Sequence, residues 1–518
     1  MALSVSPKEI VEKDEHPLLR TSPRWERVEL DLVADVQNGF PFKSALFSTE
    51  NGFPLIRIRD VGQSGTLHYY TGEFEDEFIV ESGDILIGMD GDFRAARWRG
   101  RRALLNQRVC RVLLRSQYYD ENFLVLCLQP YLDAINAETS SVTVKHLSSK
   151  TVKQLPLPLP PLNEQRRIVA RIEAMFDEID HGVENLKKAK ATLGLYRQSL
   201  LKAAFEGRLT ADWRAQNPDK LEDPETLLVR IQKEREARYQ AALDDWQKNL
   251  ADWREGGEKG KKPAKPKRPR DMDARPVDIG VSGWTILPLG LLIDTPSYGT
   301  SKKCDYDAGT KGVLRIPNIG SGRVDASDLK SANFDDSEIE QYRLQKGDVL
   351  TVRSNGSLSI VGKPALITEK DTDFLFAGYL IRLRPVPGSL VPENLAFLMI
   401  EPTVRSQVES KAKSTSGVNN ISAKEIEELL VPICSLEEQA EITRVLDERL
   451  SAADALEAEI DAGLTRAEAL RQSILKQAFS GKLVPQDPND EPASVLLERI
   501  QAEKAKAPKA KLRRKATA

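Results

Sequence analysis

The chain carries two copies of one sequence unit, and this repeat constrains its fold more than any other feature does. Leu162-Asn-Glu-Gln165 recurs as Leu436-Glu-Glu-Gln439, 274 positions later. The same offset aligns residues 197–209 with residues 471–483, so that about 65 residues match without a gap. Chance similarity does not preserve such an order. We therefore predict two similar domains, each followed by a closely matched segment.

The closely matched segments, residues 164–206 and 437–480, are predicted to be long helices. Their apolar residues recur about every 3.56 residues, between a heptad seam and a straight helix. Ser435-Leu-Glu-Glu438 has the spacing of a capping box, and Gly207 and Gly481 stand where C-terminal caps belong. We expect two antiparallel, coiled-coil-like helices that pack on each other through this stripe. The stripe comprises Ile168, Ile172, Met175, Ile179, Val183, Leu186, Leu193, Tyr196 and Leu200, and then Ile442, Leu446, Leu450, Ala453, Leu456, Ile460, Leu464, Ala467, Leu470 and Ile474.

The regions before the two helices are predicted to be α+β domains. Residues 22–160 and 281–432 alternate short β-rich runs with Gly, Asn and Asp turns, and short helical stretches follow. We expect a curved, mostly antiparallel sheet in each. Between the repeats, residues 221–255 have a helical composition, and the Lys/Pro-rich run at 260–269 is typical of a linker.

The net charge of −3 argues weakly against nucleic-acid binding, but the charges are unevenly distributed. Residues 71–92 hold eight acids and no basic residue, whereas residues 94–115 hold eight arginines and no acid. These arginines alternate with apolar residues, which predicts a one-sided basic face. The clusters at 259–270 and 504–515 are interpreted as a solvated linker and tail.

No enzyme signature is present in the sequence. Gly356 to Pro364 fails as a phosphate-binding loop, because Pro364 stands where Ser or Thr must contact Mg²⁺. Asp90 and Asp92 are interpreted as solvated turn residues, and the four histidines lack metal-ligand spacing. The four cysteines show no C-x-x-C pairing, and no stretch approaches the ~18 apolar residues of a membrane span. We expect a cytoplasmic protein without a catalytic site, metal or cofactor of its own.

A family resemblance follows from the helix starts. The segment from Leu155 through Pro161 to Gln165, leading into a long helix, resembles the conserved region of type I restriction–modification specificity subunits, and residues 430–439 are similar. The domains resemble that family in three elements, which are Gly39-Phe-Pro-Phe-Lys-Ser44, Asn106-Gln107, and Gly347-Asp-Val-Leu350 followed by Arg353-Ser-Asn-Gly356. The first domain departs from the pattern, since Gly88-Met-Asp-Gly91 replaces Arg353-Ser-Asn-Gly356.

The resemblance implies a non-catalytic DNA reader with an internal pseudo-two-fold repeat. Each target-recognition domain would read one half of a split double-stranded DNA site, with the helices setting the gap. Two adenine methyltransferase subunits using S-adenosylmethionine would dock on the helices, and motor–nuclease subunits using ATP and Mg²⁺ would join them. The expected division is an N-terminal arm (1–21), target-recognition domain 1 (22–160), spacer helix 1 (161–207), a helical insertion and basic linker (208–280), target-recognition domain 2 (281–432), spacer helix 2 (433–481), and a C-terminal helix and basic tail (482–518).

Reading DNA requires Arg, Lys, Asn or Gln at base edges and basic residues at phosphates. The candidates are Lys43, Arg94, Arg97, Asn106, Gln107, Arg108 and Lys145 in the first domain, and Lys302, Lys303, Arg353, Ser354, Asn355, Lys363, Asn419 and Asn420 in the second. Ile168, Ile172, Ile179, Leu186, Ile442, Leu446, Leu450 and Ile460 are the candidates for the helical scaffold that partners would use. Three alternatives stay open: a restriction–methylation polypeptide with its own reader, the reader of another phage-defence methylation system, and a helical structural protein that binds no DNA.

Overall fold

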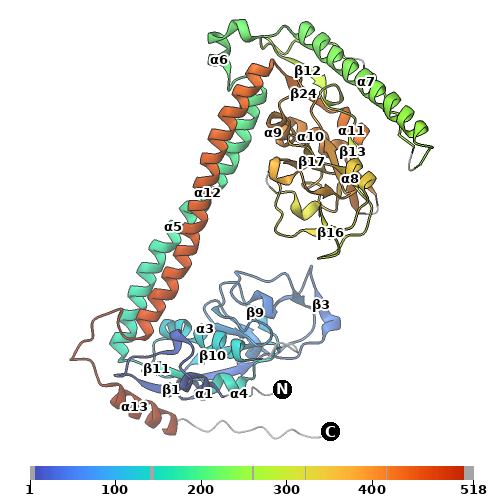
Figure 1. The fold of residues 1–518 in the computed structure, drawn as a ribbon. Helices are drawn as coiled ribbons and strands as arrows, with labels where there is room; N and C mark the ends of the chain where they lie inside the picture. Colours follow the sequence, from blue (N-terminus) through green and yellow to red (C-terminus); the bar gives the residue numbers. More distant parts are fainter. Residues whose placement is uncertain are drawn as a thin grey trace. The chain divides into compact units, whose positions relative to one another are not determined.

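The computed structural model describes residues 6–139, 145–259, 262–272, 274–320, 322–415 and 417–506. The chain forms two compact units, residues 1–187 with 461–518 and residues 188–460. Each unit contains one α/β domain and a stretch of both long helices (Figure 1). We call residues 22–160 the first domain and residues 281–432 the second domain.

The first domain is centred on a four-stranded antiparallel sheet of order β2-β10-β7-β8. Helix α3 (Glu121–Glu138) covers it, because Leu124, Leu128 and Leu132 are buried in the same core as Ile85 and Val112. A second sheet has the order β3-β5-β4-β9-β6. The elements are α1 (Pro7–Glu12), β1 (Glu26–Glu29), α2 (Leu30–Val33), β2 (Ala34–Asn38), β3 (Phe47–Ser48), β4 (Phe53–Ile56), β5 (Tyr69–Tyr70), β6 (Ile79–Val80), β7 (Ile85–Gly88), β8 (Ala95–Arg97), β9 (Ala103–Leu105), β10 (Val109–Leu114), α4 (Ser149–Lys153) and β11 (Pro156–Leu159).

The second domain repeats this plan with the sheet order β13-β21-β17-β19-β15, and α9 packs against β17 and β19. Smaller sheets have the orders β16-β14-β20 and β18-β23-β22. The elements are β12 (Thr285–Pro288), β13 (Ser297–Tyr298), β14 (Lys311–Leu314), β15 (Gly322–Arg323), β16 (Lys330–Ala332), α8 (Asp336–Tyr342), β17 (Val349–Val352), β18 (Ser354–Asn355), β19 (Pro364–Leu366), β20 (Leu375–Phe376), β21 (Leu380–Leu383), α9 (Pro392–Ile400), α10 (Pro402–Lys411), β22 (Lys413–Thr415), β23 (Val418–Asn420), α11 (Ala423–Glu427) and β24 (Leu430–Ile433).

The α+β prediction is confirmed, but the expectation of one sheet in each domain is wrong. The strands divide among several sheets, and β4·β9, β14·β20 and β15·β19 are parallel pairs. A parallel pair needs a long connection, and 46 residues separate Ile56 at the end of β4 from Ala103 at the start of β9. Alternation of apolar residues marks single strands and does not reveal which strands pair.

A buried glutamine at the same position of each repeat joins each domain to its long helix. Gln165 accepts a hydrogen bond from the Asp120 amide (2.7 Å), directly before α3. Gln439 accepts one from the Val391 amide (2.9 Å), directly before α9. Each side-chain amide also donates to a backbone carbonyl five residues earlier. The repeated Glu-Gln dipeptide is therefore a structural joint, since it satisfies buried backbone groups where a domain meets a helix.

The long helices α5 (Leu162–Phe205) and α12 (Leu436–Phe479) lie side by side (Figure 1). In the first unit Asp180 contacts Arg471, and a side chain added at Gly463 would meet Leu186. In the second unit Lys190 and Arg197 both pair with Glu457, and Arg197 also pairs with Asp454. From Asp180 to Leu186 the residue numbers rise along α5, while those of their neighbours in α12 fall from Arg471 to Gly463. This confirms the antiparallel prediction.

The helix caps are confirmed at three of the four predicted positions. Gly207 and Gly481 adopt positive φ at the helix C-termini, and Ser435 accepts a hydrogen bond from the Glu438 amide. The other predicted hydrogen bond of the capping box, from the Ser435 amide to the Glu438 side chain, is wrong, however. The Glu438 carboxylate instead accepts hydrogen bonds from Thr210 and Arg214, because these side chains reach it as a buried partner.

The apolar stripe is only partly buried. Ile168, Ile172, Ile442, Leu446 and Ile460 are buried, whereas Ile179, Leu186 and Leu450 are half-buried. The expectation that the whole stripe packs inside the helix pair is wrong for Tyr196 (42 % exposed), Leu456 (53 %) and Leu470 (49 %). A spacing that is not that of a strict heptad drifts around a straight helix, so part of the stripe turns outward.

A further helix follows each long helix: the one after α5 packs on the second domain, and the one after α12 packs on the first domain. The predicted helical stretch at 221–255 is α7 (Pro224–Glu255), and α13 (Ala493–Lys506) is its counterpart, with α6 (Ala211–Gln216) preceding α7. Leu227 and Ile231 of α7 are buried like Leu496 and Ile500 of α13. Residues 262–269 form no regular secondary structure, and most of the basic cluster at 504–515 lies outside the described residues.

Candidate nucleic-acid interface

The opening loops of the two domains have the same backbone geometry. Gly39 directly follows β2, and Gly299 directly follows β13. A Cβ atom at Gly39 would lie 2.1 Å from the Asn106 carbonyl oxygen, and one at Gly299 would lie 2.1 Å from the Phe376 carbonyl oxygen. Only glycine fits at such a close approach. Four residues later, Lys43 and Lys303 occupy matching, exposed positions.

A second pair of segments matches through backbone hydrogen bonds. The Gly88 amide donates to the Arg94 carbonyl, as the Val352 amide donates to the Lys363 carbonyl. The Met89 amide donates to Arg108, and the Arg353 amide donates to Tyr379. In space, therefore, Arg94 corresponds to Lys363, Arg108 corresponds to Tyr379, and Met89 corresponds to Arg353.

The same correspondence extends to the segment before the long helices. Lys145 accepts a hydrogen bond from the Gly91 amide, and Asn419 lies opposite Asn355 in β23 and β18. Lys145 and Asn419 are 274 positions apart, so the repeat offset places them at the same point of the fold. The DNA-contact candidates of the two domains thus lie on matching surfaces, one in each domain.

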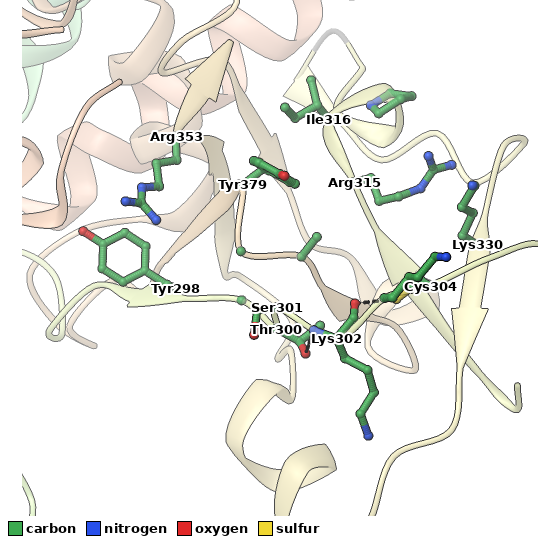
Figure 2. Close-up of a pocket in the computed structure, with 15 residues that line it drawn as sticks. Tyr298, Thr300, Ser301, Lys302, Cys304, Arg315, Ile316, Lys330, Arg353 and Tyr379 are labelled. Carbon is green, nitrogen blue, oxygen red and sulfur yellow. Dashed lines mark hydrogen bonds between the residues drawn. The ribbon is translucent and has the colours of Figure 1, made fainter. Parts of the chain in front are cut away.

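In the second domain this surface contains a cavity of about 790 Å³ (Figure 2). Five of its lining residues are cationic and none is acidic. The candidates Lys302, Lys303 and Arg353 contribute three of these cations. The other two, Arg315 and Lys330, were missed because nothing in the sequence indicated that β14 and β16 reach this loop. The lining residues are Tyr298, Gly299, Thr300, Ser301, Lys302, Lys303, Cys304, Arg315, Ile316, Pro317, Lys330, Arg353, Ala377, Gly378 and Tyr379.

Three of the five cations are neutralised by acids outside the cavity lining. Lys302 pairs with Glu338 at 2.6 Å, and this contact lowers the pKa of the Glu338 carboxyl. Arg315 pairs with Asp328 and Lys330 with Asp305, both at 3.1 Å. Lys303 and Arg353 form no ion pair within the part of the chain that the structure describes. The positive charge available to a ligand therefore lies mainly on these two residues.

The remaining second-domain candidates surround Arg353. Its backbone is held by Tyr379 on one side and Ile421 on the other. Ser354 and Asn355 form β18, which pairs with Asn420 and Asn419 of β23. These candidates come from segments more than 60 residues apart, and the structure brings them together. Lys363 is half-exposed in the strand-end loop next to Val352.

In the first domain the arginine run is largely neutralised by other side chains. Arg111 pairs with Asp84 at 2.9 Å, Arg102 with Glu81 at 2.8 Å, and Arg108 with Asp90 at 3.3 Å. These acids all come from the acidic run at 71–92, and Arg97 and Arg115 also pair with acids. The expectation of a one-sided basic face is therefore wrong, because the acidic and basic runs fold against each other.

Several first-domain candidates make internal contacts. Arg97 donates to the Gly83 carbonyl and to Asn122, and Lys145 donates to the Asn136 carbonyl at 2.7 Å. Asn106 is buried, and its side chain accepts a hydrogen bond from the next amide. Lys43, Arg94 and Gln107 remain exposed, as does Arg108 beside Asp90.

Asp90 is a residue that sequence reasoning misjudged. Its carboxylate is only 14 % exposed and lies 2.6 Å from Nδ1 of His146 and 3.3 Å from Nε of Arg108. The interpretation as a solvated turn residue is therefore wrong. His146 is the repeat counterpart of Asn420, 274 positions later, and the offset alone was the signal that could have drawn attention to it.

The described residues contain no group of three or more His, Cys, Asp and Glu side chains placed to hold a metal ion. None of the helices formed by the described residues is long and apolar enough to cross a membrane. All four cysteines are free thiols, and burial raises the pKa of Cys110 to about 12. A thiol with so high a pKa is unreactive at neutral pH.

Comparison with known proteins identifies the family. Residues 23–188 and 284–466 match the family model described as the type I restriction modification DNA specificity domain. The EcoBI specificity subunit of Escherichia coli is 31 % identical over 518 residues, which cover 98 % of each chain. The chain belongs to the family of type I restriction enzyme specificity subunits.

Two further comparisons agree with this membership. The StySPI specificity subunit of Salmonella potsdam is 23 % identical to this specificity subunit over 93 % of this chain and 96 % of its own. One similar solved structure comes from work on the complex assembly and conformational transition of the type I R-M system. The match covers 90 % of this specificity subunit and 100 % of the other chain, with a TM-score of 0.59 and 17 % identity. That structure shares the fold. The match therefore confirms the predicted class of two mixed α/β domains and long helices.

Proposed function

We propose that this specificity subunit reads a two-part site on double-stranded DNA, one half with each domain. The observation that carries this proposal is the duplicated surface, where Gly39 and Gly299, Lys43 and Lys303, and Arg94 and Lys363 occupy matching positions. Two similar surfaces in one chain suit two stretches of one duplex. The side chains differ between the surfaces, so the two half-sites differ in sequence.

The proposal includes two modification subunits that dock on the long helices. Its support is that the exposed residues Tyr196 and Leu470 lie 274 positions apart, at equivalent points of the repeat. Exposed apolar side chains at matching positions suit two copies of one partner. Pull-down from cells that express both chains should give about two modification subunits per specificity subunit. A fully active complex with one modification subunit would contradict the duplicated-scaffold idea.

The chemistry belongs to the partners in this proposal. The modification subunits use S-adenosylmethionine to methylate adenine at N6, and restriction subunits use ATP and Mg²⁺ for translocation and cleavage. The specificity subunit contributes DNA reading and scaffolding. The purified chain alone should transfer no methyl group from labelled S-adenosylmethionine to DNA, whereas the chain with its modification subunit should do so.

The test of DNA reading is selection from a randomised duplex library by the full-length chain together with its modification subunit. The expected result is two short, different motifs at a fixed separation. Selection of one continuous motif would contradict the two-part reading, and binding without any sequence preference would support a helical scaffold protein instead.

A further inference from the structure

Arg353 is distinct among the cations of the second-domain cavity. Lys302, Arg315 and Lys330 are paired with carboxylates, whereas Arg353 has no acid within ion-pair distance among the described residues. Lys303 is also unpaired there, but it lies on an exposed loop. Arg353 is half-buried and leads into a paired strand, β18.

Two side chains contact the guanidinium of Arg353, and one of them, Tyr298, is seen beside it in Figure 2. Its carbon lies 4.5 Å from the centre of the Tyr298 ring, which is a stacking distance for a cation and an aromatic face. Its Nε donates to the Asn420 Oδ1 at 3.2 Å. The Tyr298 hydroxyl in turn accepts a hydrogen bond from the Ala423 amide at 2.9 Å, so the ring itself is fixed.

This arrangement leaves one edge of the guanidinium free. Nε is occupied by Asn420, and the two terminal nitrogens make no hydrogen bond within the described residues. A fork of two parallel N–H donors fits two adjacent acceptors. In the major groove only guanine offers two acceptors on one base, O6 and N7.

We propose that Arg353 reads a guanine in the second half-site through its terminal nitrogens, and that Tyr298 and Asn420 are the positioning residues. The proposal rests on the proposed function, since it assigns one base to a surface that must first read DNA. Reading a base requires a fixed side chain, and the Arg353 guanidinium is positioned by two neighbours, Tyr298 and Asn420. A phosphate contact needs no such fixation, and exposed lysines such as Lys303 suit it better.

At the matching described positions, the first domain has no such fork. Met89 occupies the position of Arg353 and is only 4 % exposed. Asn38 stands in place of Tyr298, and its side chain donates to Ser149. The guanine contact is therefore specific to the second half-site.

The first experiment compares the motifs that full-length variants select from a randomised duplex library, with the modification subunit present. Arg353→Gln should lose one guanine in the second motif and favour adenine there, because glutamine pairs with adenine N6 and N7. Arg353→Lys keeps the charge but not the fork, so it should bind DNA yet discriminate guanine about tenfold less well. Lys330→Ala removes an ion-paired cation of the same cavity and should leave both motifs unchanged.

The second experiment tests the acceptor without changing the protein. The guanine that the first experiment identifies is replaced by 7-deazaguanine, which lacks the N7 acceptor. The wild-type chain should lose about tenfold in affinity, whereas Arg353→Lys should be much less sensitive. Tyr298→Ala should lower discrimination at that base, and Tyr298→Phe, which keeps the ring, should lower it less.

The outcomes separate this inference from the proposed function. If wild type selects two motifs and Arg353→Gln selects the same two, the guanine assignment is overturned while DNA reading stands. An equal loss in both motifs would also overturn it. If wild type selects no motif, the proposed function itself has failed.

Discussion

The two domains share one backbone plan but use their charged side chains differently. In the first domain, acids within the same domain neutralise most of the arginine run, as in the pair of Arg111 with Asp84. In the second, a cavity is lined by Arg353, which stacks on Tyr298 and has no acid partner among the described residues. The difference teaches that the cations of a basic run can be used for ion pairs within the folded domain. Binding chemistry instead depends on which cations lack an acid in the folded chain.

The largest expected effect concerns an Asp–Arg ion pair that is more deeply buried in the second domain than in the first. Asp348 is fully buried and accepts two hydrogen bonds from Arg384, whereas Asp84 is one-fifth exposed beside Arg111. Asp348→Ala should destabilise the second unit by up to about 3–5 kcal/mol, because it leaves the half-buried Arg384 guanidinium without its carboxylate partner. Asp84→Ala should cost less. Urea unfolding followed by circular dichroism checks the order, and equal losses would show that burial does not distinguish the two pairs.

The next largest expected effect concerns the buried glutamine that joins each domain to its long helix. Gln165→Ala and Gln439→Ala each leave a buried amide, Asp120 or Val391, without its acceptor. Each variant should lose about 1–3 kcal/mol of stability, and the two losses should be similar. Hydrogen exchange at the two amides gives a local readout. A loss in one variant only would break the equivalence of the two joints.

A smaller effect tests the equivalence of Arg94 and Lys363. If both contact phosphate, Arg94→Ala and Lys363→Ala should each flatten the slope of log K against log salt by about one unit. The measurement is DNA affinity at several salt concentrations, with the modification subunit present. An unchanged slope for one variant would assign the phosphate contact to the other domain alone.

The smallest effect is a pH dependence at the first joint. Burial raises the pKa of the Glu164 carboxyl, despite a hydrogen bond from Trp25. Because its folded pKa is raised, the folded state holds the proton more tightly, and stability falls as pH rises from the ordinary value of 4.5 through the raised pKa. Glu164→Gln should remove this fall. Glu438→Gln, at the matching position, instead weakens the contacts to Arg214 and Thr210 and should destabilise the second unit. Unfolding midpoints between pH 4 and 7 are the measurement; a fall that persists in Glu164→Gln would assign it to another group.

The sequence was sufficient to predict the repeat, the long antiparallel helices and most of their caps. Such features depend on periodicity and on local residues such as Gly207 and Gly481, which a sequence displays directly. Matching positions such as Lys145 and Asn419 followed from the offset alone.

The contacts that decide the candidate site could not be predicted in this way. Arg353 meets Tyr298 and Asn420 only because strands from three parts of the chain converge. The pairing of Asp90 with His146 likewise joins residues 56 positions apart. Charge runs in a sequence do not reveal which charges fold against each other, and this is why the basic face was wrongly expected.

The central claim, that each domain reads its own half of the site, is tested most directly by exchanging a domain. A chain in which the first domain replaces the second, joined at the matching strands β11 and β24, keeps both long helices and both buried glutamines. Library selection in the presence of the modification subunit should then yield the first motif twice and the second motif not at all. If the second motif survives without the second domain, the sequence is read elsewhere and the account is wrong.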